Sequence, residues 1–134
     1  MDRLTIEQRS RLMARIKSRD TKPEMAVRST LHRLGYRYRL HVKGLPGCPD
    51  LVFPGRRKII LVHGCFWHGH SCPRGRSVPK SNVDFWTTKI QANRKRDART
   101  LRKLRRVGWS VLTLWECVIN KNLWLSKALN FLGE

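Results

Sequence analysis

Acidic residues are scarce in this chain. Nine Asp and Glu residues oppose 29 Lys and Arg residues, which leaves the 134-residue chain with a formal net charge of +20. A surface with this charge repels itself in the folded state and attracts polyanions over long range. The charge balance therefore predicts that the partner is a nucleic acid.

Long apolar runs and abundant cysteine are also missing. The longest aliphatic run, residues 59–62, is far shorter than the roughly 20 residues that a membrane-spanning helix needs. Residues 1–4 show no apolar core of a signal peptide. Four cysteines, two of them close to histidines, indicate metal ligands in a reducing compartment rather than a disulfide framework. We therefore expect a soluble cytoplasmic protein with no membrane partner.

No internal repeat or low-complexity linker divides the sequence, so residues 1–134 are expected to form a single domain. Periodicity and capping residues predict helices over 21–35, about 84–107 and 123–132, after a basic N-terminal helix or arm within 1–20. Strands are expected over 36–42, 50–53, 58–62 and 109–115. The inward side chains of the long helix are expected to be Phe85, Ile90, Leu101 and Leu104. These elements predict an α/β fold with a mixed β-sheet flanked by helices.

The densest group of metal-binding side chains lies in residues 65–72, where two cysteines and two histidines share a segment too short to fold on itself. Thiolate and imidazole are the ligands that tetrahedral zinc prefers, and a structural zinc site takes four of them. The expected ligands are Cys65, His70, Cys72 and Cys117. Cys48 competes with Cys117 for the fourth position, and local spacing leaves open which histidine binds the metal.

Aromatic side chains accompany this segment. Phe66 and Trp67 would be held in a metal-pinned loop, and Trp86 lies near the start of the long helix, so all three are candidates to wedge between base pairs. Trp109 and Trp115 alternate along a strand and are expected in the core. The Lys and Arg residues over 89–106 fit either a solvated helix face or phosphate contact, and the scarcity of acid favours phosphate contact.

Asp50 is the first candidate for chemistry. It follows Pro49 at the start of an expected strand, a place where nucleases hold Mg²⁺ on a carboxylate, although an Asp after Pro also suits an ordinary turn. His63 ends the next strand and His68 follows five residues later, so either could act as a general base or be structural. Glu24 sits at the third helical position after Thr21, which makes helix capping its ordinary role.

Several segments, in order from about residue 5 to residue 118, resemble the very-short-patch repair (Vsr) DNA mismatch endonucleases. The matching segments are Arg9-Ser10-Arg11, Asp20-Thr21-Lys22-Pro23-Glu24, Leu45-Pro46-Gly47, Pro49-Asp50, His63-Gly64-Cys65-Phe66-Trp67-His68, Phe85-Trp86, Lys89-Ile90, Gly108-Trp109 and Trp115-Glu116-Cys117. The most specific of them is the segment from His63 to His68.

The resemblance implies a bacterial enzyme that nicks one DNA strand beside the thymine of a T·G mismatch. Such mismatches arise when 5-methylcytosine deaminates at the target sequence of a cytosine methyltransferase. The implied fold is restriction-endonuclease-like, in a form where histidine chemistry replaces the usual Glu-x-Lys half of the motif. The family also implies double-stranded DNA as substrate, a possible MutL-type repair partner and action as a monomer.

Carried over by position, the resemblance assigns roles to individual residues. Asp50 and the main-chain carbonyl of Val62 would hold Mg²⁺, and His68 would be the general base, with His63 and Glu24 assisting. Zn²⁺ would sit on Cys65, His70, Cys72 and Cys117. The DNA-contacting side chains would be Phe66, Trp67, Trp86, Lys89, Asn93, Arg96, Arg99 and Arg102.

Two positions depart from the family pattern. Val62 stands where some relatives carry Thr, and Cys48 stands where they often carry a basic residue. Only the backbone carbonyl is needed at residue 62, so we expect activity to survive. Two other classes stay open: a non-catalytic, zinc-stapled DNA-binding module and a basic RNA-associated protein of ribosomal type.

Overall fold

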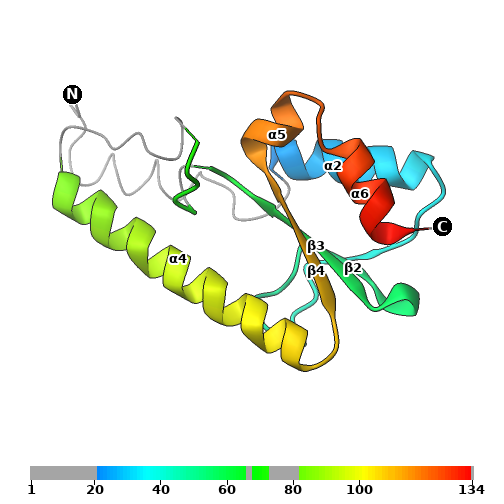
Figure 1. Ribbon diagram of the computed structural model, residues 1–134, viewed down its shortest axis with the longest axis horizontal. Coiled ribbons are helices and arrows are strands. Elements are labelled where there is room, and N and C mark those ends of the chain that lie inside the picture. The colour runs from blue at the N-terminus through cyan, green and yellow to red at the C-terminus, as the bar shows by residue number, and fades with distance from the viewer. Residues whose placement is uncertain (1–20, 66–67, 73–81, 134) are drawn as a thin grey trace.

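A computed structural model of the chain shows a four-stranded mixed sheet with helices on both faces (Figure 1). The structure describes residues 21–65, 68–72 and 82–133. The expected helix or arm within 1–20, and the candidate wedges Phe66 and Trp67, lie outside these ranges. Within the described ranges, no helix is both long enough and apolar enough to cross a membrane. The α/β fold class expected from the sequence is confirmed.

The elements follow one another in a simple order. They are α2 (Lys22–Arg33), β1 (Arg39–Leu40), β2 (Leu51–Phe53), the short 3₁₀ helix η1 (Pro54–Arg56), β3 (Lys58–His63), α4 (Val83–Arg106), β4 (Ser110–Trp115), α5 (Glu116–Asn120) and α6 (Leu125–Leu132). The sheet order is β1-β2-β3-β4, with β1 antiparallel to β2, β2 antiparallel to β3, and β3 parallel to β4. The long helix α4 is the crossover that makes the last pair parallel.

The two faces of the sheet bury different side chains, because consecutive residues of a strand point to opposite faces. Ile60 of β3 packs with side chains of α2, α5 and α6, whereas Ile59 and Leu61 pack with Leu104 of α4. In Figure 1, α4 accordingly lies on one side of the strands and the other three helices lie on the opposite side. The central strands β2 and β3 are therefore apolar on both faces. Asp50 directly precedes β2 and His63 ends β3, so both candidate residues are attached to these buried strands.

Local sequence explains the start of α2 and the loop ahead of Asp50. The Thr21 hydroxyl accepts a hydrogen bond from the Glu24 backbone N–H at 3.3 Å, so the expected N-cap of α2 is present. In the loop before Asp50, Gly47 has a φ of +75°, and a Cβ there would lie 2.5 Å from Thr100 Cγ2 of α4. Glycine thus permits both the backbone conformation and the close approach that holds this loop against α4.

The structure corrects several expectations. The strand expected over 36–42 shrinks to Arg39–Leu40, because the chain turns at His41, whose φ is +46°. Phe85 does not face inward: it is 49% exposed, near the solvent end of a helix whose buried residues are Ile90 and Leu104.

Two tryptophan predictions also change. Trp109 and Trp115, expected in the core, are only half-buried, whereas Trp124 is buried among α2, α5 and α6. The short helix α5 was not anticipated, since five residues are too few to show a periodic pattern. Trp124 fills the space between α5 and α6, and its burial depends on the packing of both helices rather than on local sequence.

Candidate active site and metal centre

One cluster surrounds the carboxylate of Asp50. This residue directly precedes β2, and its Oδ2 accepts a hydrogen bond from the backbone N–H of Val62 on β3 at 2.8 Å. Glu24 of α2 is 1% exposed and belongs to the same group. One ligand atom each from Glu24, His41 and Asp50 lie within 4.8 Å of one another. Nitrogen and oxygen donors at this spacing could hold a divalent cation.

The carboxylate of Glu24 has two nitrogen-bearing partners. His41 Nε2 lies 3.1 and 3.0 Å from its two carboxylate oxygens, and Arg28 Nη1 donates to Oε2 at 2.9 Å. A buried carboxylate needs partners of this kind, because an unpaired charge in the interior is strongly destabilising. Glu24 therefore has two roles. Its backbone N–H completes the N-cap of α2, and its carboxylate contacts His41.

The electrostatics of Asp50 differ from those of an exposed acid. Burial raises the pKa of its carboxyl from 3.8 to about 6, against the opposing hydrogen bond from the Val62 N–H. The negative charge of Glu24 also raises this pKa, while His41 and His68 lower it. A buried carboxylate beside a second acid is stabilised in its ionised form by a bound cation.

A second cluster contains the two candidate bases. The rings of His63 and His68 stack with centroids 3.8 Å apart and planes 4° apart. His68 Nδ1 lies 2.5 Å from Asp97 Oδ2 of α4. When Nδ1–H donates to a carboxylate, the lone pair of a neutral imidazole is on Nε2. This orientation is the one that a general base requires.

Burial and neighbouring charges shift the pKa values of two residues in this cluster. Burial, followed by the neighbouring His68, lowers the pKa of His63 to about 4. Burial would raise the pKa of Asp97, but the hydrogen bond and charge of His68, with His63 and Arg96, hold it below its usual value. Near pH 7, His68 therefore lies between two different neighbours: the ionised carboxylate of Asp97 and the neutral imidazole of His63.

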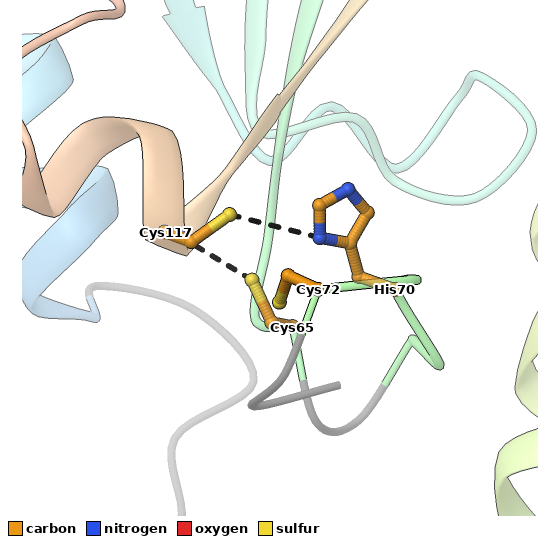
Figure 2. Close-up of side chains that lie close together, drawn as sticks. All are labelled: Cys65, His70, Cys72 and Cys117. Carbon is orange, nitrogen blue, oxygen red and sulfur yellow. Dashed lines mark hydrogen bonds between the residues drawn. The ribbon is translucent and has the colours of Figure 1, made fainter. Parts of the chain in front are cut away.

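The third cluster consists of the four residues expected to bind metal. Figure 2 shows Cys65, His70 and Cys72 from one loop and Cys117 from the start of α5 pointing toward one another. Cys117 N–H donates to Cys65 Sγ at 3.3 Å, and Cys117 Sγ lies 3.6 Å from His70 Nδ1. All four donor atoms lie within 4.8 Å of one another. Three sulfur donors and one nitrogen at this spacing fit a tetrahedral metal ion.

The surroundings of Cys65 reinforce this fit. Cys65 is fully buried, and burial raises the pKa of its thiol to about 12; the Cys117 backbone N–H opposes this rise, while the thiols of Cys72 and Cys117 add to it. Thiolates this close together need a compensating cation, which a metal ion supplies. The rival ligand Cys48 is exposed, in the loop before β2, and is not a member of this group.

Most of the predicted DNA-contacting residues lie within α4. Lys89, Arg96, Arg99 and Arg102 are exposed and Asn93 is half-buried. Each lies three or four residues from the next, so neighbouring members are adjacent on the helix surface, and the series winds from Asn93 round to Arg102 on the opposite side. At its beginning, Phe85 and Trp86 form an edge-to-face pair with ring centroids 5.0 Å apart. The helix thus presents an aromatic pair at one end and a row of polar and basic side chains beyond it.

Sequence reasoning missed two residues of the first two clusters. His41 looked like one more alternating residue of a strand, and only its left-handed backbone brings it to Glu24. Asp97 lies inside a dense run of Lys and Arg in a chain with only nine acids. That isolation was a usable signal, because a single acid in such a run is a candidate for a specific partner.

Several known proteins are similar to this chain. Residues 1–74 match the family described as DNA mismatch endonuclease Vsr. A relative named type II nicking enzyme V.XorIIP, from Xanthomonas oryzae pv. oryzae, is 54% identical over 119 residues, covering 89% of this chain and 87% of the relative. The DNA mismatch endonuclease Vsr of Escherichia coli is 41% identical over 111 residues, covering 83% and 70%. Type II nicking enzyme V.NmeAIP of Neisseria meningitidis is 41% identical over 129 residues, covering 96% and 91%.

Replacement of Cys117 tests the metal centre. Cys117→Ala should lose the bound metal and most of the associated stability, because a structural metal ion contributes its binding free energy to folding. Cys48→Ala is the matched control, since this exposed thiol should leave metal content and stability unchanged. Elemental analysis and urea unfolding of both variants provide the measurements. A metal-replete Cys117→Ala protein beside a metal-free Cys48→Ala protein would reverse the assignment.

The raised pKa of Asp50 predicts a pH-dependent stability. A carboxyl whose pKa is higher in the folded state stabilises fully below its unfolded value, and this contribution is lost as pH rises from 3.8 to about 6. At about 1.4 kcal/mol per pKa unit, the loss at pH 7.5 is about 3 kcal/mol. Without added Mg²⁺, Asp50→Asn should therefore exceed the parent in stability by about this amount at pH 7.5, and by about half as much at pH 5.

Urea unfolding of the metal-replete protein between pH 5 and pH 8 measures this difference. Added Mg²⁺ should narrow the gap by stabilising the ionised carboxylate of the parent. A gap that stayed constant across this pH range would show that Asp50 is ionised as easily in the folded chain as in the unfolded one.

Proposed function

Because the chain belongs to the Vsr family of DNA mismatch endonucleases, we propose that it nicks one strand of duplex DNA beside the thymine of a T·G mismatch. Mismatches of this kind result from deamination of 5-methylcytosine, and the nick would begin very-short-patch repair. The mixed α/β domain agrees with a restriction-endonuclease-like fold. The observation that carries the proposal is the contact between His68 and Asp97, which orients His68 as a general base, in a chain that also holds Glu24, His41 and Asp50 close enough to bind a divalent cation.

We assign the chemistry to residues of the first two clusters. Asp50 and the main-chain carbonyl of Val62 would bind Mg²⁺, which supplies charge neutralisation at the phosphate when bound. His68 would take a proton from the attacking water at Nε2, while Asp97 holds the ring through Nδ1. His63 would assist as a neutral ring stacked on His68, and Glu24, paired with Arg28 and His41, would complete the acidic side of the site.

The remaining assignments concern structure and binding. We propose Zn²⁺ as the structural ion of the cluster formed by Cys65, His70, Cys72 and Cys117, because its sulfur-rich donor set favours zinc over Mg²⁺. The row of basic residues on α4 would contact phosphates, and Phe66, Trp67 and Trp86 would wedge beside the mismatch. Family resemblance supports a monomer acting in the bacterial cytoplasm and a MutL-type partner.

Cleavage of a defined duplex tests the proposal. Asp50→Ala should abolish Mg²⁺-dependent nicking of T·G DNA with little loss of binding, since its carboxylate holds a cation rather than a base pair. His68→Ala should slow nicking by roughly 10²-fold or more, the scale of a lost general base. His32→Ala, a change at an exposed histidine of α2, is the matched control and should cut at the parental rate.

Gel analysis of a labelled duplex gives the nicking rate, and titration of the same duplex gives its affinity. A parent protein that bound T·G DNA but never cut it would favour the alternative of a non-catalytic, metal-stapled DNA-binding module.

The aromatic and basic residues should divide selectivity from affinity. Trp86→Ala should bring the affinities for T·G and T·A duplexes closer, because unstacking costs less at a weakly paired step. Neutralising Arg99 and Arg102 should weaken binding to both duplexes alike, since phosphates are the same in matched and mismatched DNA. The affinity of this variant should also depend less steeply on salt concentration. Binding titrations of both duplexes at several salt concentrations separate the effects. Full mismatch preference in Trp86→Ala would remove this residue from recognition.

A further inference from the structure

Trp115 touches both the metal centre and the candidate bases. It ends β4, where it is paired with His63 of the neighbouring parallel strand. Its ring stacks on the His70 imidazole with centroids 4.2 Å apart and planes 16° apart. The same ring meets His63 edge-on at 5.3 Å and His68 at 6.4 Å, with interplanar angles of 76° and 72°. One indole therefore lies between a metal-ligand ring and the two stacked rings of the second cluster.

The backbone around Trp115 is fixed from both sides. On one side, the six-residue pairing of β3 with β4 sets its position relative to His63. On the other side, the next residue, Glu116, accepts a hydrogen bond from the Cys65 backbone N–H at 3.4 Å, and Cys117 contributes its thiol to the metal centre. The backbone of Trp115 is therefore held in place. A ring that packs on its indole is positioned relative to Cys65, His70 and Cys117.

His68 needs such a support. Its contact with Asp97 fixes one atom, Nδ1, but a single hydrogen bond leaves the ring able to tilt about that contact. Stacking on His63 defines the plane of the ring, and His63 in turn packs against Trp115. A displacement of about 1 Å in a catalytic group can lower the rate about 10²-fold, so the support of the plane matters to a base.

We propose that Trp115 is a positioning residue that holds the His63–His68 pair against the metal-ligand ring of His70. The proposal rests on the nicking function proposed above. His70, held among Cys65, Cys72 and Cys117, would thus support Trp115, and Trp115 would fix the orientation of His68 toward the attacking water. Trp115 itself need not touch the DNA or the reacting atoms.

Three variants test this role. Trp115→Leu removes the flat surface between His70 and His63, and it should lower kcat about 10-fold with KM for the mismatched duplex unchanged. Trp115→Phe keeps one aromatic ring and should recover most of the rate, to within about 3-fold of the parent. Trp109→Leu is the control, because this half-buried tryptophan precedes the other end of β4 and packs on Arg57 instead. Its kcat should equal that of the parent, and all three variants should retain the metal.

Two further measurements distinguish positioning from general damage. In a His68→Ala background, Trp115→Leu should have no additional effect on the residual nicking rate, because the residue through which it acts is gone. Nitrogen-15 relaxation of the His63 and His68 rings should show increased mobility in Trp115→Leu, less in Trp115→Phe and none in Trp109→Leu. This second measurement does not require cleavage, so it tests the packing even if the parent does not nick DNA.

The outcomes are decisive in each direction. Parental kcat and ring mobility in a metal-replete Trp115→Leu protein would overturn the proposal, as would an equal loss of rate with and without His68. If Trp115→Leu does not fold, Trp115→Phe carries the test: a kcat about 3-fold lower with more mobile rings supports the role, and parental values for both overturn it.

Discussion

The parallel pairing of β3 with β4 brings the metal-binding cluster and the candidate bases together. A parallel pair places the same ends of two strands together, and here those ends carry His63 and Trp115. The residues that follow each strand, including Cys65 and Cys117, consequently meet although they are 52 positions apart. Asp50 joins them from the antiparallel side, through its hydrogen bond to Val62. A shift of one residue in this register would turn Trp115 to the opposite face and move Cys117 away from Cys65.

Three of the few acids of this basic chain lie close to histidines. In a molecule of charge +20, a carboxylate in solvent has many cationic neighbours and little need for a particular partner. Glu24 and Asp50 are instead withdrawn next to β2 and β3, and Asp97 faces His68 from within a basic helix. Three of the nine acids therefore lie in clusters that contain a histidine, while exposed Lys and Arg residues follow one another along α4.

Much of this arrangement was predictable from the sequence, and the reasons are local. Capping residues and apolar periodicity predicted α2, α4 and α6, and the short turn between β2 and β3 placed Asp50 near the end of the following strand. The proximity of Asp97 to His68 was not predictable, because it depends on how α4 packs after a crossover between two strands. The same holds for Trp124, whose burial depends on a helix of five residues that has no periodic signal.

The length of α4 has a geometric consequence. Its 24 residues form a rod of about 36 Å, close to the 34–36 Å or so of one turn of B-DNA. Trp86 lies near one end, Arg102 near the other, and Asp97 between them. The helix keeps the separations of Trp86, Asp97 and Arg102 constant. A duplex aligned along α4 would therefore present one particular phosphate to His68, which contacts Asp97. Correct spacing between the distorted base pair and the cut would then be a property of helix rise.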